Sequence, residues 1–126
     1  MKAAADIAVG LVALLHVYFL VLEMFLWDKP FGLRTFSMTA AKAEVTKSLA
    51  MNQGLYNGFL AAGLIWGLAL GPAGFAIKGF FLGCVIVAGV FGGLTAKTSI
   101  LLTQALPAVL ALIFVLLASR STENPH

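Results

Sequence analysis

The sequence is poor in the residues that build disulfide frameworks, metal sites and charged protein surfaces. Its 126 residues include a single cysteine, Cys84, which excludes an intrachain disulfide and a metal site made of several cysteines. Only 10% of the residues are charged, whereas 61% are hydrophobic and the mean hydropathy is +1.02. So little charge and so much apolar side-chain surface are typical of an integral membrane protein.

The sequence also lacks the features of several other classes of protein. The net charge of +3 comes from Lys and Arg scattered along the chain, without a basic patch that interleaves aromatic residues, so we expect no nucleic-acid partner. The methionines and histidines show no convincing ligand spacing, and we predict no metal site and no cofactor. The chain has no room for a soluble domain beside its apolar runs.

Four apolar runs remain, at about 4–27, 50–70, 73–95 and 99–118. Each is long enough to cross a bilayer, and a crossing segment must satisfy its own backbone hydrogen bonds, which favours helices. The first run is longer than the core of a signal peptide, so we expect it to be retained. The short connections 71–74 and 96–99 make successive helices antiparallel neighbours. We therefore predict an all-α fold, an up-down-up-down four-helix transmembrane bundle that forms one domain, 1–126.

The connection 28–49 is too polar to cross a membrane. We expect Pro30 and Gly32 to end the first helix, and the helix-forming second half of the connection to continue into the second helix. The orientation of the chain in the membrane is predicted from the number of Lys and Arg residues on each side. The side of the first and third connections would hold Lys29, Arg34, Lys42, Lys47 and Lys97, and the other side would hold Lys2, Lys78 and Arg120. This bias places 28–49 on the cytoplasmic side of the membrane and both termini outside.

Glycines recur at four-residue spacing on the second and third runs, as in Gly63 with Gly67, Gly79 with Gly83 and Gly89 with Gly93. Ridges of small residues let membrane helices approach closely, so these glycines are expected mainly to pack helices together. A homo-oligomer contact through the same faces is the alternative.

The first apolar run carries two ionisable residues, His16 and Glu23. They are seven residues apart and point within about 20° of each other, about 10 Å apart along a helix. Trp27 follows on the same stripe and marks the membrane interface. A carboxyl group inside a membrane has to pair, protonate or bind a ligand. Glu23 is therefore a candidate proton donor or acceptor, with His16 as its relay, although a buried structural histidine is an equal possibility.

The second and fourth runs carry polar residues at the same expected depth as Glu23. Gln53 and Asn57 share one helix face, Asn52 and Tyr56 share the adjacent face, and Lys97 and Gln104 lie around the start of the fourth run. These residues, together with Trp27, are the candidate ligand-binding residues, and they predict a one-sided polar cavity that opens toward 28–49, with His16 at its floor. The amides could instead only tie helices together, and Tyr56 could be an interface anchor. Pro107, beside Gln104, is expected to kink the fourth helix.

The stretches "LLHVYFLVLEMFLW" and "NQGLYNGFLAAG" resemble the domain-of-unknown-function 1304 family, which consists of small bacterial four-span membrane proteins. The resemblance covers nearly the whole chain. It implies the four-helix architecture and places six residues in the family's signature: His16, Glu23, Trp27, Asn52, Gln53 and Asn57. It implies no activity.

Three functions are compatible with these patterns. The first is a membrane pocket that binds a small amphipathic or lipid-like ligand, with or without proton-transfer chemistry, so that enzymatic activity is left open. The second is a proton-coupled transporter of small molecules that acts as a homo-oligomer. The third is a structural or assembly protein whose glycine faces form its contacts. The expected partners are the lipid bilayer, an amphipathic ligand and a second copy of the chain.

Overall fold

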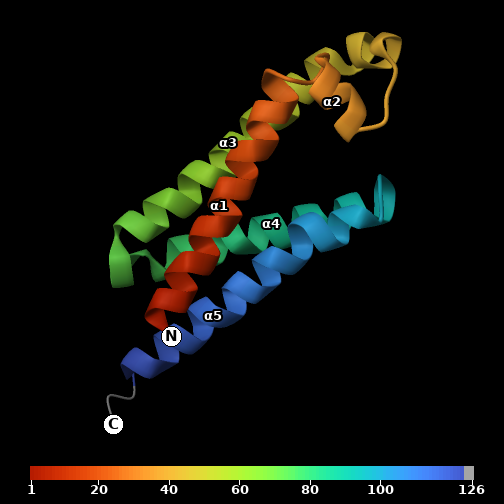
Figure 1. Ribbon diagram of the computed structural model, residues 1–126. Helices are drawn as coiled ribbons and strands as arrows, with labels where there is room; N and C mark the ends of the chain where they lie inside the picture. The colour runs from red at the N-terminus through yellow and green to blue at the C-terminus, as the bar shows by residue number, and fades with distance from the viewer. Residues whose placement is uncertain (124–126) are drawn as a thin grey trace. The chain divides into compact units, whose positions relative to one another are not determined.

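The computed structural model describes residues 1–123, and every secondary-structure element in that range is helical, with no strand there. Its elements, coloured in order along the chain in Figure 1, are α1 (Lys2–Met24), α2 (Pro30–Thr35), α3 (Ala40–Ala69), a 3-10 turn (Gly71–Gly74), α4 (Phe75–Thr95), a π-helical turn (Leu101–Ala105) and α5 (Leu106–Glu123). The prediction of an all-α fold is confirmed.

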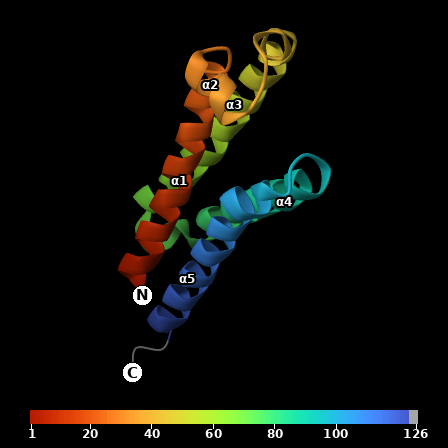
Figure 2. The same cartoon turned by 45° about the vertical axis from the view of Figure 1, so that its right-hand side comes forward.

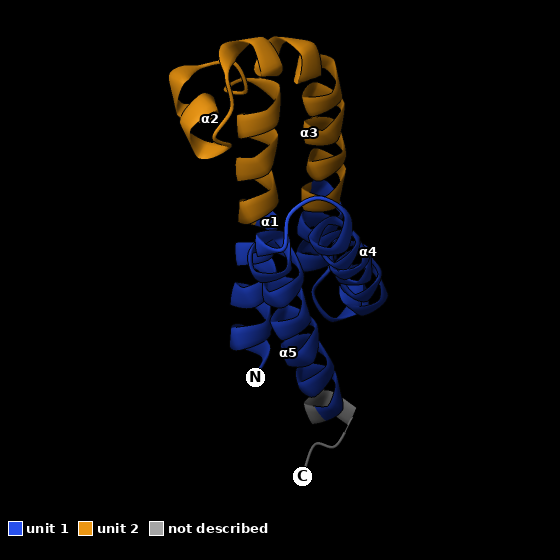
Figure 3. Cartoon of the chain, turned by 90° about the vertical axis from the view of Figure 1, so that its right-hand side faces the viewer, with its two compact units in different colours: residues 1–13, 62–126 blue, residues 14–61 orange. Residues whose placement is uncertain are grey.

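The chain forms two compact units, coloured separately in Figure 3. The first unit comprises residues 1–13 and the chain from residue 62 onward, and the second comprises residues 14–61. The boundary between the units falls within α1 and within α3. The predicted single domain 1–126 therefore stays a prediction, and each unit is described by itself below.

Three stretches of helix are long and apolar enough to cross a membrane: Lys2–Met24, Gly71–Thr95 and Leu101–Arg120. The helix that contains the predicted second span, α3, is not among them. Its 30 residues begin in the polar sequence after residue 39 and then pass through the amides at 52, 53 and 57, which lowers the hydropathy of the whole helix. The four-span bundle is accordingly not confirmed, although α3 is continuous from the connection into the apolar run, as predicted.

In the first unit, α4 packs antiparallel against α5, and the two helices lie side by side in both views of Figures 1 and 2. Glycines allow the approach. A Cβ atom built on Gly89 would lie 2.6 Å from the backbone nitrogen of Ala105, and one built on Gly93 would collide with the side chain of Leu101. The end of α3 packs in the same way on the start of α4, because Gly63 faces the ring of Phe81. These contacts confirm the packing role predicted for Gly63, Gly89 and Gly93, whereas a Cβ atom built on Gly79 or Gly83 would have no heavy atom within 4 Å.

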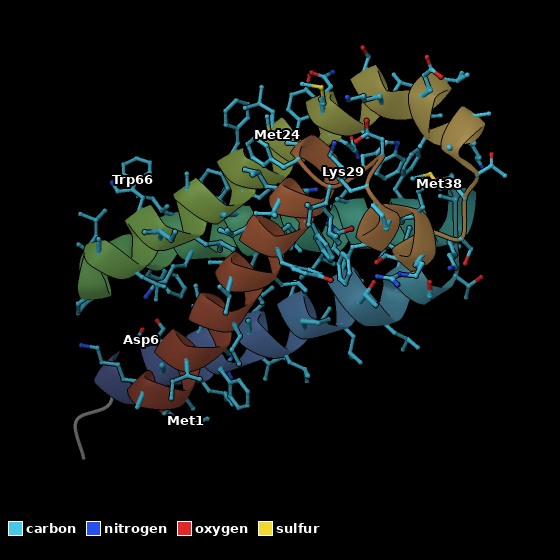
Figure 4. All side chains as sticks on the ribbon, turned by 45° about the horizontal axis from the view of Figure 1, so that its top comes forward. Met1, Asp6, Met24, Lys29, Met38 and Trp66 are labelled. Carbon is cyan, nitrogen blue, oxygen red and sulfur yellow. The ribbon has the colours of Figure 1, made fainter. Side chains whose placement is uncertain are left out.

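In the second unit, the C-terminal half of α1 pairs with α3 (Figure 3). A Cβ atom on Gly54 would lie 2.6 Å from Cγ of Met24, and one on Gly58 would lie 2.7 Å from Cδ1 of Leu20. Leu22, on the same part of α1, is only 2% exposed. Trp66 lies on α3 beyond the unit boundary, is 56% exposed and projects away from its helix (Figure 4). Small residues thus set the register in which α1 and α3 meet.

The prediction that Pro30 and Gly32 end the first helix is wrong. The helix ends at Met24, where the hydrogen bonds change from the helical pattern to a turn, and Pro30 begins α2 as its first residue. Proline suits that position because its missing N–H would have no partner there, and Lys29 before it is extended. A Cβ on Gly32 would strike the carbonyl oxygen of Leu26, so glycine lets α2 fold back onto the end of α1.

The predicted disturbance near Pro107 takes the form of a π-helical turn rather than a bend within a regular helix. The turn covers Leu101–Ala105 and ends where the N–H of Leu106 bonds to the carbonyl of Leu101. Pro107 has no N–H with which to continue the regular pattern, and the wider turn immediately before it accommodates this loss. Gln104 is therefore displayed from a widened turn in the first unit.

Candidate functional site

The most specific polar contact in the second unit joins α1 to α3. The side-chain amide Nδ2 of Asn57 donates a hydrogen bond to Oε1 of Glu23 over 2.5 Å. Both side chains are half-buried, and Glu23 is one residue before the end of an apolar helix. Gly54, one turn before Asn57, brings the helices together here, because a Cβ on it would lie 3.1 Å from Cβ of Glu23. The structure thus brings together two of the residues that the sequence predicts for the site.

Two further contacts fasten the polar connection to α3. The indole Nε1 of Trp27 donates to Oγ1 of Thr46 over 3.0 Å, and the ring of Trp27 packs on Phe36 with a centroid distance of 4.7 Å. The next residue on each segment makes the second contact: Nζ of Lys47 donates to Oδ2 of Asp28 over 3.0 Å in an exposed ion pair. This hydrogen bond lowers the pKa of Asp28 below its usual value. These contacts join the connection to α3, and the predicted role of Trp27 in ligand binding stays a prediction. Thr46 carries no sequence signal that predicts this contact.

The other predicted residues of α3 lie on its exposed side. Asn52, Gln53 and Tyr56 are exposed, and the Tyr56 ring contacts Phe59 at a centroid distance of 6.1 Å. Asn52 lines an open hollow of about 460 Å³ on the flank of the α1–α3 pair. The full lining is Met24, Ser48, Leu49, Met51, Asn52 and Leu55. Apart from Asn52, none of these residues was predicted, because an open hollow depends on how two helices meet rather than on local pattern.

His16 is completely buried, at 0% exposure, in the apolar stripe of α1. Its ring meets Phe19 edge to face at a centroid distance of 5.4 Å. Across the described residues, no fully buried side-chain nitrogen or oxygen lacks a hydrogen-bond partner. This environment is that of a satisfied buried histidine, and the proposed relay from His16 to Glu23 stays a prediction.

Lys97 and Gln104 belong to the first unit. Lys97 is exposed just beyond the end of α4, where its backbone N–H bonds to the carbonyl of Gly92 over 3.1 Å, and Gln104 is half-buried in the π-helical turn. Their predicted role in ligand binding stays a prediction. No group of three His, Cys, Asp or Glu side chains in the described part of the chain is placed to hold a metal ion.

The arrangement has a clear chemical character. A carboxyl group and an amide are held together at the end of an apolar helix. On the same pair of helices, an uncharged open hollow is lined by methionine and leucine side chains with Ser48 and Asn52 as polar groups. Such a mostly apolar surface with few polar groups suits an amphipathic molecule better than an ion. Taken with the three apolar helices, the fold is that of an all-helical protein fitted to a membrane.

The chain belongs to the family described as "Protein of unknown function (DUF1304)", whose sequence profile matches residues 10–116. This confirms the resemblance drawn from the sequence. The "Uncharacterized protein YpaA" of Lactococcus lactis subsp. lactis (strain IL1403) is 36% identical over 105 residues, which cover 82% of this chain and 88% of that protein. No solved structure matches the chain.

Proposed function

We propose that this protein binds a small, neutral amphipathic ligand, such as a lipid with an uncharged head group, on the flank of its α1–α3 pair. One observation carries the proposal: the open hollow of about 460 Å³ that is lined by Met24, the residue after Glu23, and by residues of α3. Its volume is within the range of ligand sites, roughly 300–1,000 Å³. In this interpretation the bond between Glu23 and Asn57 holds the wall of the hollow in place.

The lining argues for a particular kind of ligand. Met24, Met51 and Leu55 offer adaptable apolar surface for an acyl chain, because methionine side chains adjust to irregular shapes. Ser48 and Asn52 offer a hydroxyl and an amide, which donate to and accept from hydroxyl or ester groups. None of the lining residues is charged, so a neutral head group leaves no buried charge without a partner.

The Glu23 carboxyl group supplies the possible chemistry. Among the described residues its one hydrogen bond comes from Asn57 to Oε1, which leaves Oε2 for a donor on a ligand. A hydroxyl group that reached Oε2 would be within range of proton transfer. Glu23 would then be the proton acceptor, and binding would be required before any such step.

The binding test uses the delipidated full chain in detergent with monoolein as the neutral amphipath and oleate as the charged one. Leu55→Trp fills the hollow, and we expect it to weaken monoolein binding at least tenfold in native mass spectrometry. Val45→Trp is the matched control, because Val45 is on the same helix, is 83% exposed and does not line the hollow. Wild-type protein should bind monoolein more tightly than oleate. Equal monoolein binding by the two tryptophan variants would contradict the proposal.

We also propose that a second copy of the chain packs on one face of α4. A Cβ atom built on Gly79 or on Gly83 would have no heavy atom within 4 Å, unlike one built on Gly89 or Gly93 of the same helix. Gly79 and Gly83 line an open apolar groove of about 670 Å³ with Cys84 and the exposed Phe80 and Phe91. A groove of this kind lets another membrane helix approach closely, and a two-fold contact would bring the two Cys84 residues near each other.

The oligomer test uses Cys84 as its reporter, since it is the chain's single cysteine. Mild oxidation of membranes should give a covalent dimer of the wild-type protein and none of Cys84→Ser. Gly83→Leu is expected to reduce the dimer several-fold by filling the groove, whereas Gly10→Leu, on the open side of α1, should leave it unchanged. A wild-type chain that forms no cross-link, or a Gly83→Leu chain that forms as much, would overturn the proposal.

A further inference from the structure

A second polar cavity, of about 90 Å³, lies in the first unit and is unrelated to the hollow on α1 and α3. It is formed where the first turns of α1, the 3-10 turn, the start of α4 and the end of α5 meet. Its polar lining consists of Lys2, Asp6, Lys78 and Ser119. Asp6 projects from the beginning of α1 (Figure 4).

Lys78 is the unusual member of the cavity. Only 8% of this residue is exposed, although it carries a charge in an otherwise apolar helix. Its stem passes over Gly67, where a Cβ atom would lie 2.6 Å from Cγ of Lys78 and 3.1 Å from its backbone nitrogen. A glycine at position 67 is therefore needed for the lysine side chain to follow this path. The lysine is built into the unit rather than spread over its surface.

The ammonium group of Lys78 faces the cavity without a partner among the described side chains. No described carboxylate oxygen lies within 4.0 Å of this ammonium group. The ion pair among the described residues joins Lys47 to Asp28 instead. No described hydrogen bond includes its side chain, and no fully buried side-chain nitrogen or oxygen of the described residues lacks a partner, so Nζ is not fully buried. Lys78 lines the cavity, which gives Nζ a place to open into. An ammonium group at the wall of such a cavity interacts with an anion or with water.

The surroundings favour an anion. Lys2 adds a second positive charge, and the cavity lies at the N-terminal ends of α1 and α4, where the helix dipoles are positive. Asp6 supplies one negative charge against these two lysines. The cavity volume of about 90 Å³ is enough for a few water molecules or for one small tetrahedral oxyanion.

We propose that this cavity binds a phosphate group, held by Lys78 and Lys2. The same chemistry could come from a phospholipid head group at the membrane surface or from phosphate in solution. Asp6 is expected to oppose binding, because it places a carboxylate beside the anion. The proposal does not depend on the ligand site of the α1–α3 pair, which lies in the other unit.

The test measures anion binding by the delipidated full chain with two probes, inorganic phosphate and phosphatidylglycerol. Lys78→Met keeps most of the stem and removes the charge, and we expect it to weaken binding at least tenfold. Asp6→Asn is expected to strengthen binding several-fold. Lys42→Met is the matched control, because Lys42 is exposed on α3 and its side chain makes no described contact. Binding constants come from native mass spectrometry for the lipid and calorimetry for phosphate.

The two probes distinguish the sources of the phosphate group. Binding of phosphatidylglycerol alone would identify a head group, and binding of inorganic phosphate would identify a soluble anion; either result supports the site if it depends on Lys78. If Lys78→Met does not fold, Asp6→Asn still decides, because unchanged or weaker binding in that variant would show that the anion does not bind beside Asp6 and would overturn the proposal. Unchanged binding in Lys78→Met, or binding of neither probe, would also overturn it.

Discussion

Asn57→Leu is expected to lower the free energy of unfolding by about 2 kcal/mol, within the ~1–3 kcal/mol that it costs to leave a buried acceptor without its hydrogen-bond partner. The substitution removes the donor of the Glu23–Asn57 bond and leaves a half-buried carboxyl group without its partner. The free-energy cost of removing that carboxyl group from water is then no longer offset by a hydrogen bond. Unfolding in mixed detergent micelles, followed by tryptophan fluorescence, measures the change.

The double variant makes this prediction specific to the pair. Glu23→Leu in the Asn57→Leu background should restore most of the lost stability, because replacing both partners by apolar groups is close to neutral. The two effects should therefore be strongly non-additive. Gln53→Leu is the control, since Gln53 is exposed one turn away and should change stability by no more than about 0.5 kcal/mol. Simple addition of the two single effects would show that the bond contributes nothing.

Gly89→Ala is expected to destabilise the first unit by about 1–3 kcal/mol, the usual cost of forcing an extra methyl group into a packed contact. The new Cβ would lie 2.6 Å from the backbone nitrogen of Ala105 and 2.8 Å from its Cα. Backbone atoms cannot rotate aside as a flexible side chain can, so α4 and the π-helical turn would have to separate. Thermal unfolding of the purified chain measures the loss.

Gly10→Ala is the matched control for Gly89→Ala. Both glycines are inside helices, but no heavy atom lies within 4 Å of a Cβ built on Gly10. Alanine in an open helical position is favoured over glycine by about 0.5–1 kcal/mol, so this variant should be slightly more stable than wild type. The same chemical change is thus expected to have opposite signs at the two positions. Changes of the same sign and size would mean that the close approach at Gly89 is not required.

Both proposed sites owe their geometry to glycines that bring backbones or side chains together. Gly54 lets α1 reach α3 where Glu23 meets Asn57, and Gly67 leaves the path that the stem of Lys78 follows. In a membrane, apolar side chains give helices little reason to associate, so close packing and interhelical hydrogen bonds carry much of the association. Packing and site geometry are therefore expected to change together when these glycines are substituted.

Much of the candidate site on α1 and α3 follows from spacing along the chain. Glu23 is conspicuous as a carboxyl group at the end of an apolar run, and Asn57 as an amide near the start of another. Their pairing required the register of two helices, because 34 residues separate them. The hollow lined by α1 and α3 could not be predicted, because its shape depends on residues such as Met24 and Leu55 that have no distinctive spacing.

The sequence by itself determined the class of protein, because hydropathy and the need to satisfy backbone hydrogen bonds act locally, so that long apolar runs in a membrane form helices. The elements of the described chain are helical, and three stretches of helix are long and apolar enough to cross a membrane. It also determined the family to which the chain belongs. Tertiary structure alone decided that Pro30 starts a helix, that Trp27 bonds to Thr46, and that Lys78 opens into a cavity. Such contacts join residues far apart in the chain, and only the packing of whole helices fixes which of them meet.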